Sequence, residues 1–158
     1  MAEFNSAENL NMNLAENLST DVMTGGLDER MFLYFRLSGS MKKADGVDII
    51  VSFLMESGVK MILKDLDQAL QRGAKIRILT GNYLGITQPS ALYLIKRKLG
   101  DQVDLRFYND PKRSFHPKAY MFHYATYSEM YIGSSNVSRS ALTSGIEWNY
   151  RFNSKTDP

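Results

Sequence analysis

The sequence has 158 residues and no cysteine, so disulfide bonds and cysteine-based zinc sites are excluded. It also has no apolar run near the roughly 20 residues that a transmembrane helix needs. Residues 1–24 lack the basic start and the apolar core of a secretion signal. The spacing of the two histidines, His116 and His123, is not a metal-ligand pattern. These absences predict a cytoplasmic protein without a membrane partner, a metal or another cofactor.

The net charge of +2 is distributed unevenly along the chain. Residues 1–46 carry a net charge of −3, and residues 47–158 carry +5. A basic second part is compatible with a polyanionic partner. It is equally compatible with an ordinary solvated surface, so charge alone does not decide between the two.

Residues 1–24 differ in composition from the rest, because they are polar and acidic. They predict a flexible or partly helical lead-in. Residues 25–158 are long enough to bury one core and predict a single domain. Near its start, Asp28 is a suitable N-cap for a helix whose apolar residues recur at helical spacing as far as Met41.

Six later segments are apolar or alternate between apolar and polar residues, as strands do. They are 47–55, 75–80, 102–108, 117–125, 129–135 and 145–152. Helical segments are expected from Ser57 or Gly58 to Gly73, over 89–99 and over 137–142. The order is therefore βαβαβ followed by ββαβ, which predicts an α/β sandwich around one mixed β-sheet.

The stretch from Ser114 to Leu142 is the one that suggests chemistry. In "HPK", His116 and Lys118 alternate on a predicted strand, so their side chains should share one face. The segment "GSSN", 133–136, ends the next predicted strand and precedes a helix, where backbone N–H groups and hydroxyls can bind a phosphate. An imidazole can attack phosphorus while a lysine and neutral donors hold the charged oxygens. This set of residues suits the cleavage of a phosphodiester.

These two motifs resemble the HxK…GSxN signature of the phospholipase D superfamily. Glu147, eleven residues after Asn136, resembles the arrangement in the nuclease members, including metal-independent type IIS restriction endonucleases. The segments "RILTGNYLGITQPSAL", "SFHPKAYMF" and "IGSSNVSRSALTSGIEWN" are also similar to N-terminal phospholipase-D-like domains fused to DEAD/DEAH-type helicases. The likeness covers about residues 31–152. It departs from the superfamily pattern at His123, where an aspartate is usual.

The resemblance implies a specific mechanism. One histidine attacks phosphorus and forms a phosphohistidine, a second histidine protonates the leaving oxygen, and water releases the product without a metal. Because the chain has one HxK, a complete site requires a second copy, most simply in a twofold homodimer. The resemblance also implies DNA or another nucleic acid as substrate, and a helicase motor in the same parent chain, since no P-loop occurs here.

The expected catalytic residues are His116, Lys118, Asn136 and Glu147. Lys118, Asn136 and the two serines between Gly133 and Asn136 are expected to bind phosphate. Of these serines, Ser134 is expected to lie on the same side as Asn136, which gives Ser135 less weight. Glu147 is expected to accept a hydrogen bond from His116 and so fix its tautomer.

Each expected site residue also has a structural interpretation. A lone histidine is more often a partly buried structural residue, and a Gly-Ser turn is often a simple helix cap. His123 is expected to face the other side of its strand and to have a structural role. Nucleic-acid backbone contacts are expected from five basic residues, although each is more often plain surface: Lys96, Arg97, Lys112, Arg113 and Arg139.

Three functions are compatible with these features. The favoured hypothesis is a metal-independent endonuclease domain of a helicase-linked protein. The alternative is a catalytically silent module that binds nucleic acid or mediates dimerisation through the same pocket. Phospholipid hydrolysis is a distant third, because the chain has one motif and a histidine at position 123. Aromatic residues are frequent, but their pattern predicts core positions rather than a platform for stacked bases.

Overall fold

The structure is a computed structural model that describes residues 21–157. Within this part the chain forms a seven-stranded mixed sheet with the order β1-β7-β6-β5-β2-β3-β4. The strands are β1 (Val22–Met23), β2 (Gly46–Val51), β3 (Lys75–Gly81), β4 (Val103–Tyr108), β5 (Lys118–His123), β6 (Ser128–Gly133) and β7 (Asn149–Asn153). Strands β2, β3 and β4 are parallel, and β5 pairs antiparallel with β2. The remaining neighbours, β5 with β6, β6 with β7 and β7 with β1, are antiparallel.

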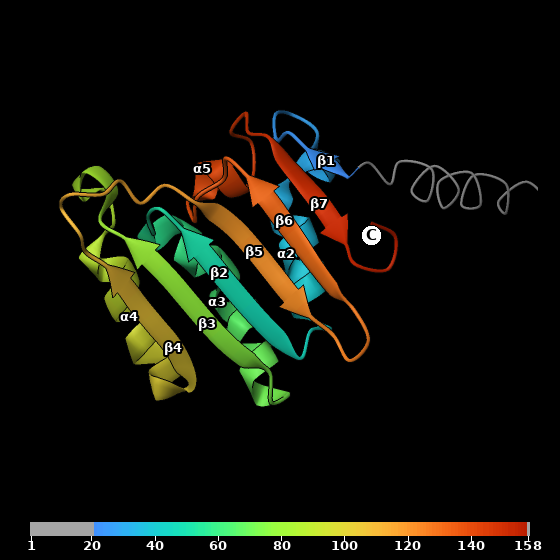
Figure 1. Cartoon of the computed structure of the whole chain (residues 1–158), viewed down its shortest axis with the longest axis horizontal. Coiled ribbons are helices and arrows are strands. Elements are labelled where there is room, and N and C mark those ends of the chain that lie inside the picture. Colours follow the sequence, from blue (N-terminus) through green and yellow to red (C-terminus); the bar gives the residue numbers. More distant parts are fainter. Residues whose placement is uncertain (1–20, 158) are drawn as a thin grey trace, which may run out of the picture.

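Four α-helices accompany this sheet in the described part of the chain. They are α2 (Leu33–Met41), α3 (Glu56–Gln71), α4 (Pro89–Leu99) and α5 (Arg139–Leu142). Three short 3₁₀ helices are η1 (Glu29–Met31), η2 (Tyr83–Gly85) and η3 (Gly100–Gln102). Figure 1 shows α2, α3 and α4 behind the sheet, while no described element covers the front face. None of the helices in residues 21–157 is both long and apolar enough to cross a membrane.

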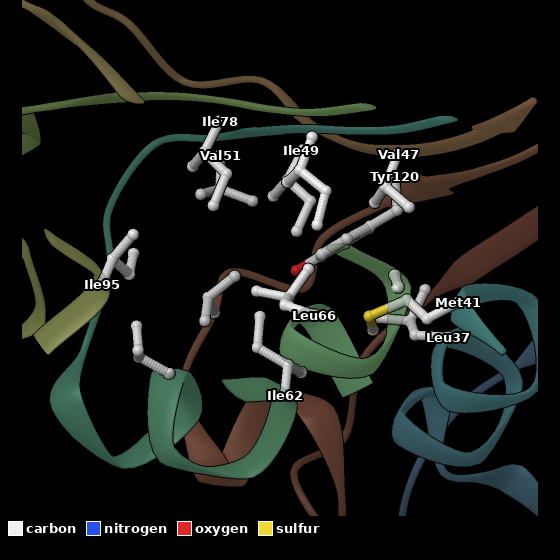
Figure 2. Packing of buried hydrophobic residues seen from close by; sticks show 14 of the residues in the cluster. Leu37, Met41, Val47, Ile49, Val51, Ile62, Leu66, Ile78, Ile95 and Tyr120 are labelled. Atoms are coloured by element: carbon white, nitrogen blue, oxygen red, sulfur yellow. The ribbon is translucent and has the colours of Figure 1, made fainter. Parts of the chain in front are cut away.

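The core lies between the sheet and these helices. Val47, Ile49 and Val51 alternate along β2 and point toward α3, where Ile62 and Leu66 meet them (Figure 2). This alternation follows from the two-residue period of a strand. The opposite face of the sheet carries charged and half-exposed apolar side chains instead. The sheet therefore has one face packed against helices and one open face.

The predicted order of elements, βαβαβ followed by ββαβ, is confirmed from β2 to β7. Pro89 occupies the first turn of α4, as predicted, because its missing N–H costs no hydrogen bond there. The predicted helix after Asp28 is interrupted. Asp28 caps η1, and Phe32 then adopts an extended conformation before α2 begins.

Three strands begin later than predicted. β4 begins at Val103 and not at residue 102, β5 begins at Lys118 and not at residue 117, and β7 begins at Asn149 and not at residue 145. Most of the expected lead-in, residues 1–24, lies outside the described residues. Its last part is described, and there β1 pairs with β7.

Candidate active site

The expected site residues gather where four strand ends meet at one edge of the sheet, which we call the site edge. Val51 at the end of β2 pairs with Lys118 at the start of β5. Gly133 at the end of β6 pairs with Asn149 at the start of β7. Because β5 and β6 are adjacent, these two pairs lie side by side. The loops that enter or leave these strand ends carry His116, the "GSSN" segment and Glu147.

His116 lies in the loop before β5 and not on the strand itself. The prediction that it lies on one strand with Lys118 is therefore wrong, because Pro117 between them has no N–H to donate to the sheet. The two residues are joined in another way, since the Lys118 Nζ donates a hydrogen bond to the His116 carbonyl over 2.9 Å. The exposed imidazole lies against the Tyr83 ring, with centroids 4.4 Å apart.

Lys118 is the buried cation of the site. It is 7% exposed and lies on the helix-covered side of the sheet, in register with Val51. Burial lowers the pKa of its ammonium, and the charge of Glu147 opposes this shift. An ammonium has three N–H donors, and the His116 carbonyl takes one of them. A bound phosphate would supply both acceptors and a compensating negative charge.

Glu147 lies before β7 and accepts a hydrogen bond from the Ser134 hydroxyl. The expected bond from the His116 ring is not present among residues 21–157, because the loop position of Glu147 directs its carboxylate to Ser134. Burial raises the pKa of Tyr120, and the charge of Glu147 adds to this shift, so that charge still reaches the interior of the site. Ser134 also accepts a hydrogen bond from the Trp148 backbone N–H at 2.9 Å. The Ser134 hydroxyl and the Glu147 carboxylate thus form a hydrogen-bonded pair at the site edge.

Gly133 makes this contact possible. A Cβ at this position would lie 1.9 Å from the Trp148 carbonyl oxygen and 2.7 Å from the Asn149 Cα. Such distances are far inside van der Waals contact, so only glycine allows the entrance of β7 to approach the end of β6. The first residue of the "GSSN" segment is therefore required by packing.

Asn136 is buried, and its side-chain oxygen accepts a hydrogen bond from the Phe53 backbone N–H at 3.1 Å. This bond fixes the amide plane and leaves the amide nitrogen as the donor that can serve a ligand. Phe53 follows β2, so the loop after β2 positions Asn136. Nothing in the sequence pattern indicated this support.

Ser135 differs from the expectation that it binds phosphate. Its hydroxyl is fully buried, donates to the Ala141 carbonyl at 2.9 Å and accepts from the Asn149 amide at 2.9 Å. Its carbonyl accepts a hydrogen bond from the Tyr120 hydroxyl at 2.9 Å. Ser135 is therefore held by β5, α5 and β7 and stabilises the turn, while Ser134 presents its hydroxyl at the surface.

The five basic residues expected at nucleic acid divide into two groups. Lys112 and Arg113 lie in the loop from β4 to β5, and Arg139 begins α5 three residues after the end of the "GSSN" turn. These three lie near the site edge. Lys96 and Arg97 lie in the last turn of α4, near the opposite edge of the sheet, and Lys96 pairs with Asp101 at 2.9 Å. The structure does not bring Lys96 and Arg97 to the site.

His123 lies on the open face of the sheet, as predicted from its odd spacing. Its Nε2 is 2.9 Å from the Asp48 Oδ2, and its Nδ1 is 3.2 Å from the Ser128 hydroxyl. Arg77 holds the same carboxylate through two hydrogen bonds of 2.6 Å. In residues 21–157, no three histidine, aspartate or glutamate side chains are grouped as ligands for a metal ion.

The family model described as "Cardiolipin synthase, PLD-like domain" matches residues 38–157. The match covers most of the chain and includes His116, Lys118, the "GSSN" turn and Glu147. The fold and the site edge thus define a phospholipase-D-like domain, and the chain belongs to this family. No curated protein matches the sequence.

The solved structures that resemble this fold include the following two. NucT from Helicobacter pylori has 12% sequence identity and a TM-score of 0.60, and the alignment covers 82% of each chain. A polyphosphate kinase from Porphyromonas gingivalis has 14% identity and a TM-score of 0.52. That alignment covers 75% of this chain and 20% of the kinase chain. Both likenesses agree with the mixed α/β sheet predicted from the sequence.

Proposed function

We propose that this domain is a metal-independent phosphodiesterase that cleaves DNA through a phosphohistidine intermediate on His116. The observation that carries the proposal is the buried ammonium of Lys118, joined to the His116 carbonyl at the site edge. Membership of the phospholipase-D-like family supports phosphodiesterase chemistry. The nearby Lys112, Arg113 and Arg139 support a polyanionic substrate.

In the first step, a ring nitrogen of His116 attacks phosphorus, so that a P–N bond forms and the P–O bond to the leaving nucleoside breaks. An imidazolium on the opposite side gives its proton to the leaving oxygen. The Lys118 ammonium and the Asn136 amide donate hydrogen bonds to the other phosphate oxygens. In the second step, the now neutral opposite imidazole takes a proton from water, which attacks phosphorus and breaks the P–N bond.

The opposite imidazole must come from a second copy of the chain, because His123 lies on the open face, hydrogen-bonded to Asp48. A twofold axis beside His116 would bring a second His116 across the phosphate. The two rings would then be on the order of 5–8 Å apart, two hydrogen-bond lengths plus the anion. Sedimentation and specific activity should therefore both depend on protein concentration. A strictly monomeric chain with constant specific activity would rule out this shared site.

The sequence resemblance to helicase-fused domains supports a wider proposal. In the parent protein, this domain would supply cleavage and a motor domain would supply strand separation. We expect that protein to act in the cytoplasm on DNA. Co-purification of a helicase activity with the native full-length protein would test this link.

The decisive experiment is cleavage of DNA by the purified chain in excess EDTA, with His116→Asn and His123→Asn as a matched pair. We expect the wild type and His123→Asn to cleave and His116→Asn to be inactive. An obligatory requirement for Mg²⁺ would contradict the phosphohistidine route. DNA binding by the wild type without any cleavage would favour the silent binding module instead.

A further inference from the structure

A second feature at the site edge is a cleft beside His116, which we call the aromatic cleft. Residues 82–84 line one side, and residues 108–115, which link β4 to β5, line the other. Its volume is about 530 Å³. That volume lies within the range of roughly 300–1,000 Å³ that is usual for small-molecule sites. Tyr83 both lines the cleft and contacts the His116 ring, so the two sites are continuous.

Three aromatic rings line this cleft, beside the apolar Leu84 and Pro111: Tyr83, Tyr108 and Phe115. Tyr108 and Phe115 stack with centroids 4.8 Å apart and an interplanar angle of 23°. All three are half-buried and retain exposed surface. Phe115 packs directly over Gly81, because a Cβ at Gly81 would lie 2.8 Å from its ring. The rings are therefore held by the ends of β3 and β4 and do not belong to the main core.

Polar groups surround the rings. Lys112 and Arg113 lie in the wall of the cleft and are exposed. The one carboxylate in this wall, Asp110, accepts a hydrogen bond from the Lys112 backbone N–H at 2.9 Å and lies 3.8 Å from the Arg113 Nε. Asp110 therefore organises the loop and pairs with Arg113, while Lys112 has no ion pair among residues 21–157 and is available to a phosphate.

Tyr83 is presented by an unusual backbone. The next residue, Leu84, has φ +52°, a left-handed conformation that is uncommon for leucine. Its side chain is 79% exposed, so packing does not explain this conformation. Such backbone is found preferentially where a loop serves a ligand. Here it turns the chain so that Tyr83 faces both His116 and the cleft.

We propose that the aromatic cleft binds the base of the nucleotide next to the phosphate that His116 attacks. This inference rests on the proposed function and names its substrate class: a nucleic acid that is single-stranded at the cleaved position. A base can stack on Tyr83 or Tyr108 only when it is unpaired and one of its faces is not already stacked on a neighbouring base. Lys112 and Arg113 would then hold the flanking phosphates.

The test uses the full chain with His116→Asn, so that no substrate is cut during the measurement. Two fluorescein-labelled probes are compared by anisotropy in EDTA: an octamer of thymidine, and the same backbone with tetrahydrofuran in place of every base. We expect the abasic probe to bind about 5-fold more weakly or worse, because base stacking on aromatic side chains is lost. Equal affinities for the two probes would overturn the proposal.

Two further variants in the same background locate the effect. Tyr108→Leu should weaken binding of the thymidine octamer and leave binding of the abasic probe unchanged. Tyr93→Leu is the matched control, because Tyr93 is an exposed tyrosine on α4 outside the cleft. Equal weakening of both probes by Tyr108→Leu would contradict base recognition there.

The base-binding proposal and the proposed function fail in different ways. If the wild-type chain does not cleave the thymidine octamer, the proposed function fails. The ratio of the affinities for the two probes then still shows whether the protein binds the bases. If the wild type cleaves both probes equally well and binds them equally, only the cleft proposal fails. The probe comparison needs no cleft variant, so an unfolded Tyr108→Leu would not prevent this decision.

Discussion

The domain has two clusters of polar side chains with similar composition. They differ in whether these side chains form hydrogen bonds with one another. The site edge has His116, Lys118, Ser134 and Glu147. The open face of the sheet has a histidine, a cation, a hydroxyl and a carboxylate as well: His123, Arg77, Ser128 and Asp48. On the open face these four groups bond to one another. At the site edge, within residues 21–157, the His116 ring nitrogens make no hydrogen bond.

The pKa values show the same difference. Burial alone would raise the pKa of Asp48, but hydrogen bonds from Arg77 and His123 outweigh it and lower that pKa. At Lys118 burial prevails over the charge of Glu147, and the pKa of the ammonium is lowered. The open-face cluster therefore stabilises its own charges, whereas the site edge contains a charge that an anionic ligand would stabilise. A cluster whose charges compensate one another indicates a structural role. A cluster with an uncompensated charge indicates a binding site.

The largest expected effect separates the two histidines. His116→Asn should lower the rate of DNA cleavage by a factor on the order of 10⁴ or more, because it removes the nucleophile. His123→Asn should leave the rate within about 3-fold of wild type, since removal of a side chain that touches no reacting atom costs little in catalysis. Both rates are measured with excess substrate in EDTA. A similar loss of cleavage rate in the two variants would contradict the assignment of a catalytic role to His116 and a structural role to His123.

The second prediction compares the two cations. Lys118→Met should lower the cleavage rate on the order of 10²- to 10³-fold, because a donor to the charged transition state is lost. It should not lower the melting temperature, since it removes a buried charge that has lost part of its hydration.

Arg77→Met should do the opposite on the open face. It leaves the buried Asp48 without two hydrogen bonds and should lower the melting temperature, with the cleavage rate retained. Thermal unfolding followed by circular dichroism gives both stabilities. A Lys118→Met protein that unfolds would assign Lys118 to the structure instead.

The third prediction compares the contributions of the two serines of the "GSSN" turn to the stability of the fold. Ser135→Ala should destabilise the fold by about 1–3 kcal/mol, because the buried Ala141 carbonyl and Asn149 amide lose their partner. Ser134→Ala should change stability by less than about 0.5 kcal/mol, as is usual at exposed positions. Urea unfolding measures both values. A larger loss from Ser134→Ala than from Ser135→Ala would reverse the two roles.

The smallest expected effect is a pH dependence from the open face. The pKa of Asp48 is lowered in the folded state, so its contribution is complete above the unfolded pKa of about 3.9 and is lost as the pH falls below it. The stability difference between wild type and Asp48→Asn should therefore shrink between about pH 5 and pH 2. Glu129, whose pKa is also lowered, is common to both proteins and cancels in the difference. A constant difference would show that Asp48 acts only through packing.

Most of the fold was predictable from the sequence because β2 to β7 and their helices have clear hydrophobic periods. The two-residue strand β1 has no such signal, since its pairing with β7 depends on backbone contacts alone. The residue types of the site were predictable from "HPK" and "GSSN". Their contacts were not, because alternation continues through His116 and Glu147 although neither residue is in the sheet.

The aromatic cleft was also beyond the sequence pattern. Tyr83 and Tyr108 are distant from His116 along the chain, and the ends of β3 and β4 bring them beside His116 and its neighbour Phe115. Their composition alone was compatible with a core. What distinguishes them in the structure is their partial exposure beside an unsatisfied imidazole.

The most direct test of the central claim is the site of covalent attachment during turnover. Oligonucleotides with fluorescein at one end or the other are mixed with the wild-type chain and quenched in alkali within the first turnover. We expect one of them to leave a label on the peptide that contains His116, and no label in the His116→Asn protein. Label on His123 or Ser134, or a wild type that cleaves DNA without ever labelling His116, would contradict the account.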